Sequence, residues 1–143
     1  MMSLYAFLLV THVAVAVIGL GSISSVALVA TVTRRAGNDA REAAAWVRPL
    51  LRYAAFCLAA MLATGILLDL ATGGAFREWW WFRGSALLLV ATGVLNGQAQ
   101  RTARAMLTAT KVSDGGLRRI ERLAYGMCGL ITAIVALMEI KPF

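Results

Sequence analysis

The sequence between residues 4 and 32 reads LYAFLLVTHVAVAVIGLGSISSVALVATV and contains no aspartate, glutamate, lysine or arginine. A helix rises about 1.5 Å per residue, so about 20 apolar residues cross the roughly 30 Å hydrocarbon layer of a bilayer. The stretch is too long for a signal peptide and no basic residue precedes it, so we expect no cleavage. It predicts a transmembrane helix.

Three further apolar stretches follow, at about residues 49–70, 83–100 and 117–140. Hydrophobic residues make up 60% of the 143-residue chain and charged residues only 15%, against roughly 45–50% and about 25% in soluble domains. We therefore predict an all-α fold, a single domain over residues 1–143 that forms a bundle of four transmembrane helices. Asn38 or Asp39 is expected to cap a short helical turn, and Pro49 to lie in the first turn of the second span.

Basic residues are concentrated in the first and third connections and their margins. The first group is Arg34, Arg35, Arg41, Arg48 and Arg52, and the third is Arg101, Arg104, Lys111, Arg118, Arg119 and Arg122. In the middle connection Arg77 and Arg83 are balanced by Asp69 and Glu78. The positive-inside rule then places both termini outside and the basic connections in the cytoplasm, in an inner (plasma) membrane.

The net charge of +7 indicates a lipid partner rather than nucleic acid, because the basic residues lie at the ends of apolar segments and form no aromatic-interleaved patch. The three tryptophans at residues 79–81 are typical of an interfacial aromatic belt. Lines of small residues, such as Gly93 with Gly97 and Ala55 with Ala59 and Ala63, predict helix packing within the chain. A homodimer through a spare face remains open.

Four ionisable residues are predicted at similar depth in the outer half of the membrane: His12, Asp69, Arg83 and Glu139. An ionisable group in the apolar region is costly and is therefore a functional candidate. His12, the only histidine, lies roughly 12 Å along the first helix. It is either a neutral imidazole bonded to a neighbouring helix or a ligand or proton-transfer group. The other three are either boundary charges or members of a polar cluster.

Cys57 and Met61 of the second span, with Cys128 of the fourth, are expected at comparable depth nearer the cytoplasm. Thiolate and thioether groups are ligands that Cu(I) prefers, so the three residues are a candidate copper site. Cysteine and methionine are also ordinary packing residues in apolar bundles.

Several short motifs occur along nearly the whole chain. They are Thr11-His12 followed by Gly19 and Gly21, then Arg34-Arg35, Thr64-Gly65, Trp81-Phe82-Arg83 and Met138-Glu139-Ile140-Lys141-Pro142. Together they resemble the four-helix membrane proteins grouped with the copper-resistance protein D domain and the HemJ-type protoporphyrinogen oxidases. The resemblance implies a haem b or metal site at His12, with Arg83 as a partner for a haem propionate.

The chain departs from this pattern in two ways. Its single histidine excludes bis-histidine haem within one chain, so a methionine, a water or a second subunit would complete the iron. Arg83 stands where lysine is more usual. If the chain is an enzyme, the resemblance implies a membrane oxidoreductase of the HemJ type.

Two other functions fit the same residues. One is a small transporter, channel or proton relay that uses His12, Asp69 and Glu139, and the other is an accessory or assembly subunit of a membrane complex. A hydrolase or transferase is the least expected class, because the chain has no nucleophile–base pair, phosphate loop or metal–carboxylate motif. The sequence identifies no catalytic residue and no substrate.

Overall fold

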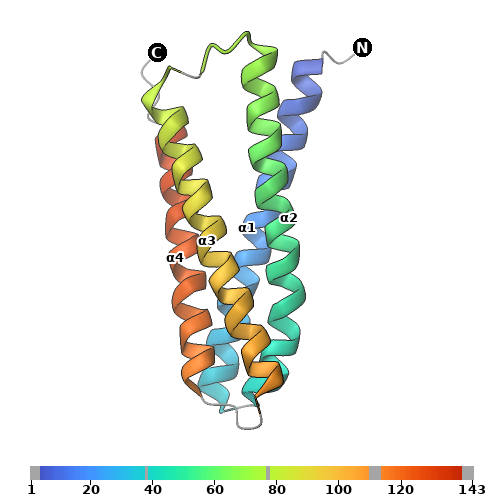
Figure 1. Cartoon of the computed structure of the whole chain (residues 1–143), viewed down its shortest axis with the longest axis vertical. Coiled ribbons are helices and arrows are strands. Elements are labelled where there is room, and N and C mark those ends of the chain that lie inside the picture. Colours follow the sequence, from blue (N-terminus) through green and yellow to red (C-terminus); the bar gives the residue numbers. More distant parts are fainter. Residues whose placement is uncertain (1–3, 38, 77, 110–113, 140–143) are drawn as a thin grey trace.

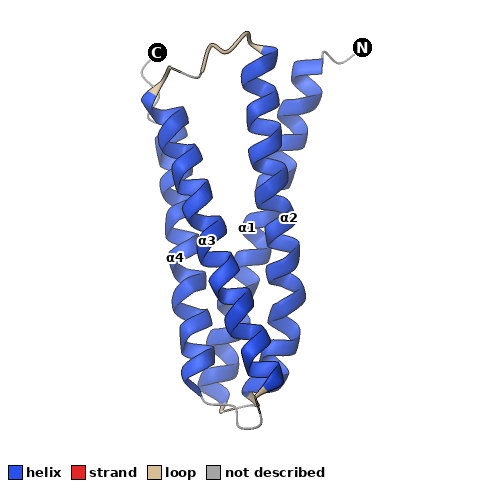
Figure 2. Ribbon diagram, in the orientation of Figure 1, coloured by secondary structure: helices blue, strands red, loops and turns tan. Residues whose placement is uncertain are grey.

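The protein is a bundle of four long helices, seen in a computed structural model that describes residues 4–37, 39–76, 78–109 and 114–139. The helices are α1 (Leu4–Ala36), α2 (Ala40–Ala71), α3 (Trp80–Thr108) and α4 (Asp114–Glu139), and no strand occurs among the described residues (Figure 2). The predicted all-α four-helix fold is confirmed. Asn38, Arg77, Lys111 and residues 140–143, which entered the sequence predictions, lie outside the described residues.

The chain runs up and down, so each helix packs against its neighbour in sequence, and α1 also packs against α4. The four helices therefore form a ring in which α2 and α4 are diagonal. The start of α1, the end of α4 and the α2–α3 connection all lie at one end of the bundle (Figure 1). We call this the outer end and the opposite one the inner end.

Helix α2 begins nine residues earlier than expected, and this corrects one prediction. Asp39 caps it, as its Oδ1 accepts the Arg41 backbone N–H at 2.8 Å. Pro49 is inside the helix rather than in its first turn. The helix continues because Ala43, Ala44 and the residues in line with them are buried against the bundle, and such packing outweighs local propensity.

Three of the helices, α1, α2 and α4, are long and apolar enough to cross a membrane. They indicate a membrane protein. Helix α3 is not among the three because it is less apolar, with Arg83, Asn96 and Arg101 along its length.

The packed core lies toward the inner end of the bundle. In α1 the first buried residue is Gly19, and every buried residue lies between Gly19 and Thr31. The helices converge at the inner end, and the α1–α2 pair diverges from α3 and α4 toward the outer end (Figure 1). The core consists largely of small side chains, which allow close helix packing; its alanines are Ala27, Ala30, Ala40, Ala43, Ala44, Ala54, Ala99, Ala103 and Ala124.

The predicted packing lines of small residues are wrong at several positions. Ala59, Ala63 and Gly93 are exposed. In a helix that is apolar on every side, the sequence does not mark which face is inward, because the usual contrast between apolar and polar faces is missing. The inward face of each helix is instead marked by other alanines.

Candidate functional site

His12 is held by a hydrogen bond between α1 and α2. Its Nδ1 lies 2.7 Å from the Thr64 hydroxyl oxygen, and the Thr64 hydroxyl also lies 2.8 Å from the Ala60 carbonyl oxygen. A hydroxyl has one hydrogen, so both short contacts are satisfied together when Thr64 donates to Ala60 and His12 Nδ1–H donates to Thr64. His12 Nε2 then keeps its lone pair as an acceptor or a metal ligand.

Gly65 lies directly against the imidazole. A Cβ atom at this position would lie 3.6 Å from His12 Cε1, which is van der Waals contact. Any longer side chain would compete with the ring for the same volume. Thr64 and Gly65 thus have distinct roles: the first orients His12, and the second leaves room for it.

A cavity of about 210 Å³ adjoins His12 and is lined by residues of all four helices. Met61 of α2 and Met138 of α4 contribute thioethers, and most of the remaining lining is aliphatic. Ser85 of α3 also lines the cavity; it is 5% exposed, and its buried hydroxyl has no hydrogen-bond partner among the described residues. The cavity is therefore an apolar space beside two polar residues, His12 and Ser85.

The side chains at this cavity are of types that bind haem iron, but the cavity is small for a haem. Histidine and methionine can both bind haem iron, and His12 with Met61 or Met138, which line the same cavity, would be the residues to hold it. The volume is below the roughly 300–1,000 Å³ of typical ligand pockets, so a macrocycle requires the helices to part at their divergent outer end. Arg83, expected beside a propionate, is exposed and does not line the cavity.

The other outer polar residues do not join His12 at this cavity. Asp69 is 5% exposed, and its Oδ1 accepts the Phe76 backbone N–H at 3.0 Å. The Phe76 ring packs against Trp81, with ring centroids 5.7 Å apart. Asp69 thereby fixes the α2–α3 connection to the end of α2. Glu139 is exposed on α4.

The residues of the candidate copper site lie in different surroundings. Cys57 faces α1, since a Cβ at Gly19 would lie 2.9 Å from Cys57 Cβ. Cys128 packs against the core from α4, and Met61 lines the His12 cavity. Both thiols are free. Within the described ranges, no group of three histidine, cysteine, aspartate or glutamate side chains is arranged to hold a metal ion.

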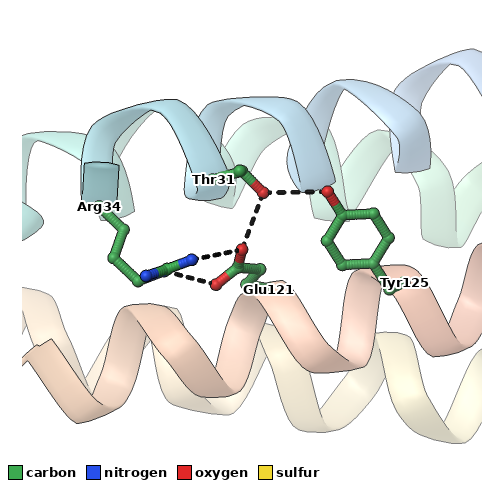
Figure 3. A network of polar contacts seen from close by, with 4 residues as sticks. All are labelled: Thr31, Arg34, Glu121 and Tyr125. Carbon is green, nitrogen blue, oxygen red and sulfur yellow. Dashed lines mark hydrogen bonds and ion pairs between the residues drawn. The ribbon is translucent and has the colours of Figure 1, made fainter. Parts of the chain in front are cut away.

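A second polar cluster, at the inner end, was missed by the sequence analysis (Figure 3). Glu121 of α4 accepts hydrogen bonds from Arg34 Nε at 2.7 Å and Arg34 Nη2 at 3.1 Å. It also accepts one from the Thr31 hydroxyl at 3.0 Å, and Thr31 lies 3.2 Å from the Tyr125 hydroxyl. The signal was present, because Thr31 and Arg34 are three residues apart and Glu121 and Tyr125 four apart, each pair on one helix face.

No model of a known protein family matches this chain, and neither do curated proteins or solved structures. The likeness to copper-resistance protein D and HemJ-type proteins therefore depends on the short motifs alone. Two of these motifs, Thr11-His12 and Thr64-Gly65, meet at the His12 site.

Proposed function

We propose that this is a four-span inner-membrane protein that binds a haem or metal cofactor through His12 in the outer half of the bilayer. The observation that carries the proposal is the His12–Thr64 hydrogen bond. With Nδ1–H as the donor, this bond leaves Nε2 with a lone pair, and the ring adjoins an apolar cavity. Metal-binding histidines are commonly oriented in this way, with the second nitrogen donating to a fixed acceptor.

The surroundings of His12 support a bound cofactor rather than a purely structural role. A histidine that only joined two helices would need no adjoining cavity and no second buried polar residue. Here the Ser85 hydroxyl is buried beside the same cavity without a partner among the described residues, and such groups ordinarily find one. A cofactor with a polar edge would supply that partner, while Met61 or Met138 completes the metal coordination.

The membrane orientation in this proposal has support from the charge distribution. Arginines gather at the inner end in α1, α2, α3 and α4, for example Arg35, Arg41, Arg104 and Arg118. When α3 crosses the membrane together with α1, α2 and α4, one membrane face carries this charge and the other carries Trp79 and Trp80, which are exposed. The positive-inside rule places the basic end in the cytoplasm.

An absorption spectrum with metal analysis tests the proposal. Protein purified in detergent from haem-supplemented cells is expected to show a Soret band, or else a near-stoichiometric metal by mass spectrometry. His12→Ala is expected to abolish the signal, and Thr64→Val to weaken or shift it because the imidazole loses its orientation. Thr132→Val, at an exposed position on α4, is the matched control and should leave the signal unchanged. Wild-type protein with neither chromophore nor metal would refute the proposal.

A further inference from the structure

A basic pocket lies between α3 and α4 toward the inner end of the bundle. It has a volume of about 530 Å³ and is lined by Gln98, Arg101, Thr102 and Ala105 of α3 and by Arg119 of α4. The two helices run antiparallel and are in extensive contact. This arrangement brings Arg101 and Arg119, which are 18 residues apart in sequence, to one concave site.

No carboxylate lines this pocket. Glu121, the nearest acidic residue to Arg119 in sequence among the described side chains, is ion-paired with Arg34 and faces a separate hollow with Arg118 and Arg122. Neither Arg101 nor Arg119 has an ion pair among the residues that the structure describes. The pocket thus has two guanidinium groups that no carboxylate of the described chain neutralises, together with the Gln98 amide and the Thr102 hydroxyl.

The chemistry of these groups matches a phosphate. Guanidinium groups bind phosphate oxygens through paired N–H donors, and the Gln98 amide adds a neutral donor. The Thr102 hydroxyl donates its proton to the Gln98 backbone carbonyl oxygen at 2.9 Å and so has none left for a phosphate. The recognition would therefore depend mainly on the two arginines.

The position of the pocket along the helices favours a lipid headgroup as the source of the phosphate. Arg101 lies about 10 Å before the end of α3, and Arg119 about 8 Å after the start of α4, at 1.5 Å per residue. Further toward the outer end the exposed side chains become large and hydrophobic, at Val94 on α3, about 10 Å from Arg101, and at Tyr125 on α4, about 9 Å from Arg119. This is the level at which lipid headgroups meet a helix, and basic pockets between helices on the cytoplasmic side are known to bind anionic headgroups.

We propose that the pocket formed by Arg101, Arg119 and Gln98 binds the phosphate of an anionic membrane lipid. The site is independent of His12 and of the cofactor proposal. Its test is also independent of membrane orientation, because lipid binding is measured on purified protein in detergent.

The experiment is native mass spectrometry of the full chain titrated with phosphatidylglycerol or with phosphatidylcholine. Wild-type protein is expected to retain one phosphatidylglycerol in preference to phosphatidylcholine. Arg101→Gln with Arg119→Gln should weaken that binding at least about tenfold, as loss of two charge-assisted contacts predicts. The matched control, Arg52→Gln with Arg104→Gln, removes the same charge at exposed positions outside the pocket and should bind as the wild type does.

Three results would overturn the proposal. Equal weakening in both double variants would mean that diffuse positive charge, not the pocket, attracts the lipid. Equal retention of phosphatidylcholine would remove the anionic specificity. Displacement of the lipid by glycerol phosphate at equal concentration would make a soluble phosphate compound, rather than a lipid, the occupant. A variant with both arginines changed to lysine keeps the charge and is expected to bind between the wild type and the glutamine variant, which separates a folding defect from a lost site.

Discussion

Glu121 joins α1 to α4 because its two carboxylate oxygens accept from Arg34 and Thr31 together (Figure 3). The carboxylate is only partly exposed, with 14% of its side chain accessible against 32% for Arg34. Water and salt therefore screen the pair less than they screen a fully exposed one. The same helices also meet through Thr31 and Tyr125.

Glu121→Gln is expected to lower the thermal unfolding temperature of the detergent-purified protein. The change removes the negative charge and places an amide N–H₂ group where Arg34 needs an acceptor. The measurement is circular dichroism at 222 nm during heating. Glu42→Gln, which removes a charge from an exposed position on α2, is the control and should melt with the wild type. Identical melting of all three proteins would contradict a stabilising role for this ion pair.

The His12 site shows which residue contacts the sequence was able to reveal. His12 stood out because an ionisable group in a long apolar stretch is costly, and its depth followed from helix rise alone. In the sequence, its partner Thr64 is noticeable only as part of the Thr64-Gly65 motif. A threonine that bonds its own helix carbonyl is indistinguishable in sequence from one that also accepts from a neighbouring helix, so this contact required the packing of α1 on α2.

At the scale of elements, α1 and α2 pack very closely at Gly19. A Cβ at this position would lie 2.9 Å from Cys57 Cβ, a distance that real Cβ atoms do not adopt. Cys57 Cβ is fixed by its backbone and cannot move aside, so only separation of the two helices relieves the contact. Glycine at residue 19 thus sets how closely the two helices pack.

Gly19→Ala is expected to destabilise the protein by about 1–3 kcal/mol, the usual cost of overpacking. Gly21→Ala is the matched control, because no atom lies within 4 Å of its added methyl group and alanine favours a helix by about 1 kcal/mol. Thermal unfolding in detergent, with the change in melting temperature as readout, distinguishes the two. A Gly19→Ala protein as stable as Gly21→Ala would show that α1 and α2 do not meet closely here.

The number and type of elements were predictable from sequence, whereas their inward faces were not. Long apolar stretches between basic connections specify four helices without any knowledge of packing. Which side of each helix is buried depends on small differences among alanine, glycine and serine, and the predicted line through Ala59 and Ala63 proved to be exposed. The start of α2 was also missed, because Pro49 suggested a beginning that tertiary packing overrides.

At the scale of the whole molecule, one prediction concerns the direction in which the bundle crosses the membrane. Ala36→Cys and Ala75→Cys place single thiols at exposed positions on opposite ends, in a background with Cys57→Ala and Cys128→Ser. In intact cells a membrane-impermeant maleimide is expected to label residue 75 and not residue 36, because the proposed orientation places the arginine-rich end in the cytoplasm. Both positions should react after lysis, which controls for thiol accessibility.

The opposite labelling pattern would reverse the orientation and place His12 in the cytoplasmic half. Labelling of both positions in intact cells would mean that α2 does not cross the membrane, since residues 36 and 75 lie on either side of that helix in the chain.

In the proposed membrane arrangement, two solvents act on one bundle whose core is concentrated at the inner end. Helix α1 has 33 residues and is about 50 Å long at 1.5 Å per residue, roughly 20 Å more than the hydrocarbon thickness. With the outer end of α1 at the outer face of the membrane, the excess falls at the inner end, where Val26, Ala30, Ala43 and Val47 are buried. Around that end, water makes apolar burial favourable, whereas at the other end lipid tails compete with side chains for the same contacts. Urea is therefore expected to act on the inner end of the bundle, and acyl-chain composition on the part around His12.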